Sequence, residues 1–158
     1  MKTKLIQFIS LFLLLLVTGV FWGTWFTLTR SIENFTAEEF IHIGKTIIAN
    51  VAVPMSIIMP SCILFMILSL WFYSLKKSLG FYLGVAAFIL IIITLLITLL
   101  ILVPIDNQIK QLTSSTVPAD WKAIRSHWKF FHAVRTFTSL ASFGCFVLSI
   151  MNSKKDTK

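Results

Sequence analysis

The chain has 158 residues, of which 57% are hydrophobic and 13% charged, with a formal net charge of +8. A soluble globular domain carries about 25% charged residues, so the composition excludes an ordinary soluble domain and indicates an integral membrane protein. Most basic residues stand at the ends of apolar stretches, where they contact lipid headgroups, and this placement argues against a nucleic-acid partner.

The first apolar stretch covers residues 5–28, which carry no charge. This stretch is longer than the apolar core of a secretory signal, and it lacks a small-residue cleavage site, so we expect a retained transmembrane helix. Gly19 and Gly23 within it have the spacing that lets a neighbouring backbone approach closely, and we interpret them as a packing notch.

The second apolar stretch covers residues 46–75 and contains Pro54 and Pro60. Proline inside a span kinks the helix and frees backbone carbonyls. Thr36 and Glu39 ahead of the stretch have capping-box spacing, so the helix is predicted to begin near residue 37 and to run into the span.

The third stretch, residues 78–105, is apolar on nearly all sides, and we expect Pro104 to end its helix. A polar connection follows, and Asp120 is a suitable N-cap for a helix beginning at Trp121. That helix becomes the fourth span over about residues 128–152.

These four spans predict an all-α integral membrane four-helix bundle, threaded up-down-up-down, with residues 1–158 as a single membrane domain. The first and third spans end, and the second and fourth begin, on one side, which we call the mouth. Lys76 and Lys77 form the tight turn on the other side, together with basic termini. The positive-inside rule then places both termini in the cytoplasm and the protein in the cell membrane as a multi-pass chain.

A polar stripe runs along the predicted helix that enters the fourth span. At about 100° per residue, seven residues at steps of three or four share one face, while His127 falls off it. The seven are Trp121, Arg125, Trp128, His132, Arg135, Ser139 and Ser142. Arginine and histidine at the entrance of a span are costly to bury and are therefore candidates for a working site.

Bundle threading brings further polar residues to the mouth, among them Asn50, Asp106 and Asn107. We expect them to meet His132 and Arg135 in one pocket. The alternative interpretation is structural: Arg135 would snorkel to headgroups or pair with Asp106 or Glu39, and His132 would be tied to Asp106 or to a backbone carbonyl.

The cysteine and histidine patterns do not predict a disulfide or a metal site. Cys62 and Cys145 both lie inside apolar spans, so we interpret them as packing residues. His42, His127 and His132 are the three imidazoles, but His127 and His132 stand five apart, not at the i, i+4 spacing that lets one helix supply two ligands.

Several of these residues resemble a known family. Val103-Pro104-Ile105-Asp106-Asn107, then Pro118-Ala119-Asp120-Trp121, and then Trp128 with His132 and Arg135 are similar to the anthrone oxygenase-like family of small four-helix membrane proteins. A few members of that family oxidise anthrones to anthraquinones. The family usually carries asparagine where this chain has Asp106, which adds a charge here.

Two classes of function follow from the residues and the resemblance. The first is a cofactor-independent oxidoreductase acting on a small apolar or aromatic substrate. In it His132 is the base, Arg135 holds the oxyanion, and Asn50, Asp106, Asn107 and Trp128 bind the substrate. The second is a non-enzymatic membrane protein that binds a lipid, quinone or small solute, or serves as a partner subunit. The lipid bilayer is the expected partner, and the sequence indicates neither a cofactor nor an oligomeric state.

Overall fold

The computed structural model describes residues 2–113 and 117–153, and all regular structure within these ranges is helical. The elements are α1 (Lys2–Thr24), η1 (Trp25–Thr29), η2 (Ile32–Asn34), α2 (Ala37–Trp71), α3 (Leu79–Ile97), η3 (Thr98–Leu102), α4 (Val103–Gln111) and α5 (Trp121–Asn152). Within the described residues these elements form four helical rods, over residues 3–34, 37–71, 79–111 and 121–152, and each is long and apolar enough to cross a membrane. The predicted all-α membrane four-helix bundle is therefore confirmed.

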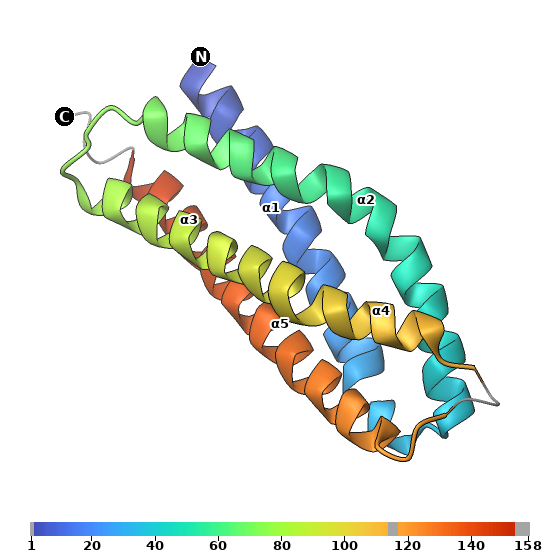
Figure 1. Ribbon diagram of the computed structural model, residues 1–158. Helices are drawn as coiled ribbons and strands as arrows, with labels where there is room; N and C mark the ends of the chain where they lie inside the picture. The colour runs from blue at the N-terminus through green and yellow to red at the C-terminus, as the bar shows by residue number, and fades with distance from the viewer. Residues whose placement is uncertain (1, 114–116, 154–158) are drawn as a thin grey trace.

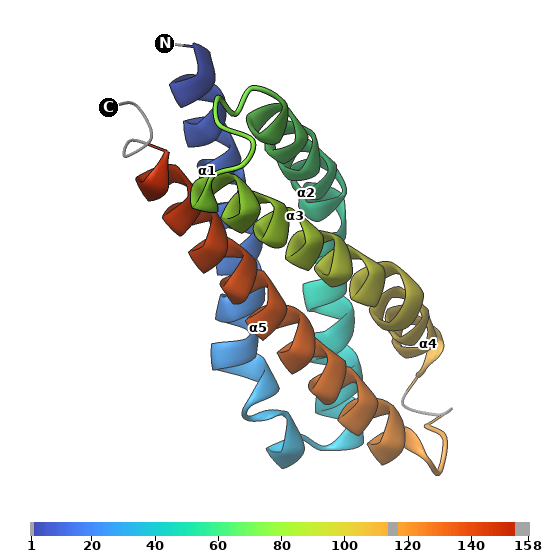
Figure 2. The same ribbon diagram turned by 90° about the vertical axis from the view of Figure 1, so that its left-hand side faces the viewer.

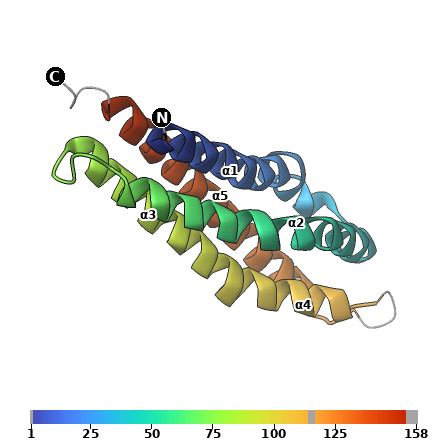
Figure 3. The same cartoon turned by 90° about the horizontal axis from the view of Figure 1, so that it is seen from above.

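The helices alternate in direction, as the up-down-up-down threading requires (Figure 1). The start of α1 and the end of α5 lie near the α2–α3 turn, and the α1–α2 connection, the end of α4 and the start of α5 lie together at the opposite end, which is the mouth (Figure 2). Helix α1 packs against α2 and α5, and α3 packs against α5 and α2, so each rod has two main neighbours (Figure 3).

The start of α2 follows the predicted capping box. The Thr36 hydroxyl accepts a bond of 3.3 Å from the Glu39 amide, and the Glu39 carboxylate accepts one of 2.8 Å from the Thr36 amide. Helix α5 begins at Trp121 with Asp120 at its N-cap, as predicted, although the Asp120 side chain makes no capping bond. Its backbone φ of −94° and ψ of 14° differ from the extended conformation that an N-cap side chain usually needs.

Pro104 does not end the third rod, contrary to expectation. A π-helical turn, η3, joins α3 to α4, and the rod continues to Gln111. Pro104 falls at the start of α4, directly after this turn, where a proline is tolerated because its missing N–H is not needed. A second π turn, η1, lies at the mouth end of α1, so two of the rods change register near the mouth.

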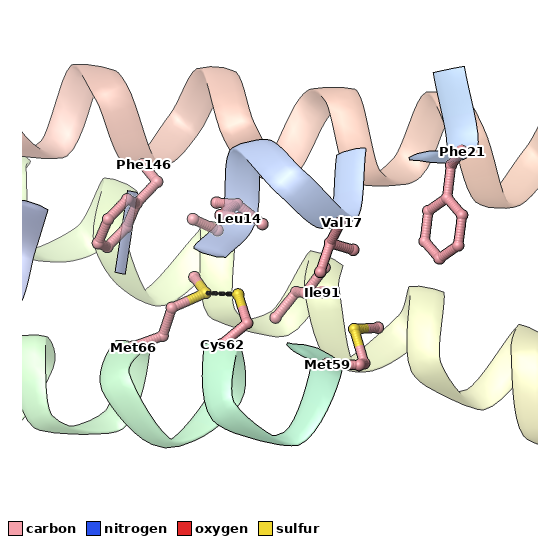
Figure 4. Packing of buried hydrophobic residues seen from close by; sticks show 9 residues of the cluster. Leu14, Val17, Phe21, Met59, Cys62, Met66, Ile91 and Phe146 are labelled. Atoms are coloured by element: carbon pink, nitrogen blue, oxygen red, sulfur yellow. Dashed lines mark hydrogen bonds between the residues drawn. The ribbon is translucent and has the colours of Figure 1, made fainter. Parts of the chain in front are cut away.

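Two apolar clusters fill the bundle, one on each side of its polar middle. The first lies toward the chain ends, draws on all four rods and is shown in part in Figure 4: Leu14, Val17, Phe21, Met59, Cys62, Met66, Ala87, Ile91 and Phe146. The second lies toward the mouth: Leu28, Ile32, Phe40, Ile41, Ile48, Leu102, Ile105, Ile109 and Trp128. Cys62 is free and buried in the first cluster.

Helices α3 and α5 are joined by hydroxyl groups that donate to backbone carbonyls. Ser142 donates to the Ala87 carbonyl at 2.7 Å, and Ser149 donates to the Gly80 carbonyl at 2.6 Å. The backbones come this close because Gly84 has no side chain: a Cβ there would stand 2.9 Å from the Ser149 hydroxyl. Small residues serve this purpose widely in membrane helix pairs.

Gly19 and Gly23 do not form the expected packing notch, since nothing lies within 4 Å of a Cβ built at either position. Both fall on a face of α1 that turns away from the bundle, because Leu14, Val17 and Phe21 take the inward positions. The close approach between rods is supplied by α3 instead.

Candidate functional site

The polar stripe of α5 faces the interior of the bundle. Trp128 and His132 are each 4% exposed, and Ser139 and Ser142 are fully buried. His127, which falls off the stripe, is exposed and contacts Phe131. Because α5 packs against α3 and α1, the stripe that the sequence predicts becomes the helix's buried face.

His132 and Arg135 form the centre of the site. The two side chains lie one turn apart, and Nη2 of Arg135 is 2.6 Å from Nε2 of His132. A guanidinium group has donors and no acceptor, so Nε2 must accept this bond, and the proton of the neutral ring then lies on Nδ1. In this arrangement the imidazole offers its neighbours a donor.

Aromatic rings enclose the pair on both sides. The Trp128 ring lies 4.4 Å from that of His132, and the guanidinium carbon of Arg135 lies 4.2 Å from the centre of the Phe21 ring. Phe21 belongs to the first apolar cluster and Trp128 to the second, so the pair is a polar layer between two apolar ones. A cation on a ring face is stabilised more strongly when water is excluded.

Thr136 fixes the backbone around the pair. It is fully buried, and its hydroxyl lies 2.7 Å from the His132 carbonyl and 3.3 Å from the Phe21 carbonyl. It can donate its single proton to one carbonyl at a time: the bond to His132 lies within α5, and the bond to Phe21 joins α5 to α1. The sequence analysis assigned no role to Thr136 or Phe21, although Thr136 follows His132 at the same helical step.

Asp106 joins the site through Trp128. The indole N–H of Trp128 donates to Oδ1 of Asp106 at 3.0 Å, which ties α5 to α4. Among the described residues no hydrogen bond joins Asp106 to His132 or Arg135, and Glu39 is engaged in the cap of α2, so these pairings of the alternative interpretation are not formed. Its other forms, a snorkelling Arg135 or a backbone tie for His132, stay predictions. The carboxylate fixes the plane of the indole that lies against the imidazole.

Asn50 and Asn107 do not join this group. Asn50 is exposed on α2, whose inward positions near the mouth are Phe40, Ile41, Gly44 and Ile48. Asn107 is exposed on α4, where its side-chain oxygen accepts a 3.4 Å bond from Lys110. Of the six predicted site residues, the structure thus assembles Asp106, Trp128, His132 and Arg135.

The site contains buried donors without acceptors. Within the described residues, Nδ1 of His132 and Nε of Arg135 are buried and have no hydrogen-bond partner. An unpaired polar group in a low-dielectric interior costs on the order of 1–3 kcal/mol, so such atoms call for a bound oxygen. The chemistry of the acceptor they fit is that of a carbonyl, an enolate or a water.

An apolar hollow lies beside Trp128 on the mouth side. Its lining comes from every rod: Leu28, Ile32, Phe35, Phe40, Ile43, Gly44, Ile109 and Trp128. Its free volume is about 10 Å³, which holds at most one water molecule. This volume does not accommodate a ring compound.

The histidines do not gather around a metal. His42 and His127 are exposed, whereas His132 is buried. Among residues 2–113 and 117–153 there is no group of three histidine, cysteine or acidic side chains that could hold an ion. The polar chemistry of the site is that of an imidazole, a guanidinium group and a carboxylate.

Comparison with known protein families identifies a match over most of the bundle. The family model described as anthrone oxygenase matches residues 47–145. This range runs from α2 to α5 and contains all the assembled site residues except Phe21. No curated protein and no solved structure matches the chain.

Proposed function

Because the chain belongs to the anthrone oxygenase family, we propose that it oxidises a small aromatic ketone carrying an acidic CH₂ group, at the pair formed by His132 and Arg135. The observation that carries this proposal is the pair of buried His132 and half-buried Arg135, with its two buried donor atoms that have no partner. A ketone that becomes an enolate supplies the missing acceptor oxygen, and its charge develops next to a guanidinium group.

The first step is removal of a proton. The substrate oxygen accepts a hydrogen bond from Arg135 and draws the guanidinium group away from Nε2 of His132. The freed Nε2 lone pair then takes a proton from the CH₂ group, and the electron pair moves to the oxygen as an enolate. Before the substrate binds, Arg135 occupies the Nε2 lone pair of His132. After proton removal, Arg135 stabilises the enolate anion.

The second step uses dioxygen as the oxidant. The enolate carbon gives its electrons to O₂ and forms a C–O bond, and His132 returns its proton to the resulting peroxide. Loss of the second C–H proton and cleavage of the O–O bond then release water and leave a ketone. The sum is CH₂ + O₂ → C=O + H₂O, which balances without a further reductant. The apolar walls keep water from the anion.

The position of the pair along α5 suits an apolar substrate. His132 lies 20 residues from Asn152, which is about 30 Å of helix and about the thickness of the hydrocarbon core. With the spans at about residues 5–28, 46–75, 78–105 and 128–152, the pair falls at the lipid boundary on the mouth side. Lys76 and Lys77 favour a cytoplasmic face at the other end, so the mouth would open outward from the cell membrane.

The test is oxygen uptake by the purified protein with anthrone as substrate, after subtraction of autoxidation. We expect His132→Ala to lower turnover by about 10²–10⁴-fold, the usual contribution of a general base. Arg135→Met should lower it by about 10²–10³-fold, as loss of an oxyanion donor does. His127→Ala, which removes the exposed histidine of the same helix, is the matched control and should retain full activity. Native protein without turnover above autoxidation would refute the proposal.

A second function is favoured by the hydrogen-bond pattern around His132. Because Nε2 is occupied by Arg135, the imidazole is set as a donor, and a donor pair can hold a quinone carbonyl without converting it. Mass spectrometry of molecules extracted with the protein distinguishes the two functions. A quinone present in stoichiometric amount, together with no anthrone turnover, would favour binding alone.

A further inference from the structure

We infer that residues 31–35, which connect η1 to α2, form a gate over the hollow beside Trp128, and that Arg125 latches this gate to α5. This inference rests on the proposed function only in that the gate would admit the proposed aromatic ketone. The latch and its opening can be measured without any substrate.

The latch consists of one arginine and three backbone carbonyls. Nη1 of Arg125 lies 3.3 Å from the Ile32 oxygen, 3.2 Å from the Glu33 oxygen and 3.2 Å from the Phe35 oxygen. The guanidinium carbon also lies 4.8 Å from the Trp121 ring, which supports the arginine from its own helix. A charged donor shared by three carbonyls holds the segment more firmly than a neutral donor would.

A second contact joins the same two elements. Nζ of Lys129, one turn along α5 from Arg125, lies 2.5 Å from Oε1 of Glu33. The side chains of this pair are 36% and 61% exposed, so the ion pair adds little to stability. Glu33 lies on the outer side of the segment, and Ile32 lies on its inner side.

The inner side of the segment closes the hollow. Ile32 is 1% exposed and, with Phe35, lines the hollow opposite Trp128. With about 10 Å³ free, the hollow holds no ring compound while Ile32 and Phe35 stay in place. Entry from the mouth therefore requires this segment to move.

The segment has little structure of its own to prevent that movement. Its internal bonds are those of a single 3₁₀ turn, Asn34 N–H to the Ser31 carbonyl at 3.0 Å and Phe35 N–H to the Ile32 carbonyl at 3.3 Å. A segment with few backbone hydrogen bonds of its own opens at lower free energy than the long helices beside it, although Ile32 is buried. Three carbonyl contacts from Arg125 are therefore a large share of what keeps the gate shut.

The test measures how fast a cysteine under the gate reacts with a water-soluble thiosulfonate reagent. Ile32→Cys places the thiol there, and native Cys62, fully buried in the first cluster, is the internal control. Arg125→Gln should raise the modification rate at position 32 by about tenfold or more, since charged hydrogen bonds are lost, and leave Cys62 unchanged. Lys129→Ala should raise it by a smaller factor, about twofold.

Two outcomes would overturn the gate. An unchanged rate at position 32 in folded Arg125→Gln protein would show that Arg125 is no latch. Equal increases at position 32 and Cys62 would show that Arg125 stabilises the whole bundle and not a local segment.

A tether separates the gate from the chemistry. Glu33→Cys with Lys129→Cys can be joined by a cleavable bis-maleimide, with the native chain treated in the same way as the control. Joining should lower anthrone turnover by at least about tenfold, and cleavage should restore it. Turnover that is unaffected by the tether would overturn the gate as the substrate entrance. If native protein has no anthrone turnover, the proposed function fails while the thiol rates still decide whether the latch exists.

Discussion

The bond between Trp128 and Asp106 makes a sharp test of how the site is built. Trp128→Phe keeps an aromatic ring against His132 but removes the indole N–H that donates to Asp106 at 3.0 Å. A hydrogen bond to a charged group contributes about 1.5–3 kcal/mol, and here the loss also leaves a partly buried carboxylate without its donor. For a chain of this length, such a loss lowers the Tm by about 3–12 °C.

The assay is thermal unfolding of detergent-purified protein, followed by circular dichroism at 222 nm. Trp71→Phe is the matched control, because Trp71 is 72% exposed and lies far from the site, and its Tm should stay within about 1 °C of native. Ring size changes in both variants, so the difference between them isolates the effect of the buried site.

A double-mutant cycle assigns the loss to the pair. Asp106→Ala alone should destabilise by a similar amount, and adding Trp128→Phe to it should cost little more, giving a coupling of about 1.5–3 kcal/mol. Additive losses, with a coupling below about 0.5 kcal/mol, would refute the reasoning, since Trp128 and Asp106 would then act independently.

Three further predictions concern the packing of the rods, and each is read from unfolding in the same detergent. Gly84→Ala places a Cβ 2.9 Å from Leu70 and Ser149, and this overpacking should lower the free energy of unfolding by about 1–3 kcal/mol. Gly19→Ala is the control: its Cβ meets nothing within 4 Å, so its free energy of unfolding should stay within about 0.5 kcal/mol of native. Ser149→Ala removes the 2.6 Å bond to Gly80 and should cost about 0.5–1.5 kcal/mol; no loss would show that the α3–α5 hydroxyl bond is dispensable. Thr36→Ala breaks the capping box of α2 and should cost about 0.5–2 kcal/mol, a loss that Thr36→Ser should largely avoid.

Sequence reasoning identified the rods and the stripe because both depend on local pattern. Uncharged runs long enough to cross a bilayer fix the number of helices, and short connections fix their alternation. The stripe from Trp128 to Arg135 follows from helical spacing alone. It becomes an inward face because that side of α5 packs against α3 and α1. The capping box of Thr36 and Glu39 is likewise a local signal.

The missed features depend on the rotation of each rod and on small irregularities within it. Asn50 was expected at the mouth pocket, yet the apolar series Phe40, Gly44 and Ile48 sets the inward face of α2 and leaves Asn50 outside. The π turn η3 carries the third rod past Pro104, and no residue pattern in that uniformly apolar stretch marks it. The contact of Phe21 with Arg135 pairs residues 114 positions apart, which only the assembled bundle brings together.

The two ends of the bundle differ in the kind of contact that holds them, and this difference explains why the site lies where it does. Toward the chain ends, Tyr73, Ser142 and Ser149 donate to carbonyls of neighbouring rods, and these direct helix-to-helix bonds leave little room for movement. Toward the mouth, bonds between rods also occur, such as Trp128 to Asp106, but two π turns and a short 3₁₀ segment held by Arg125 interrupt the regular helices there. The Phe21 ring supplies an apolar wall beside the Arg135 guanidinium group, and the proposed substrate needs a movable wall on the mouth side. The layer of His132 and Arg135 lies at the boundary where both conditions are met.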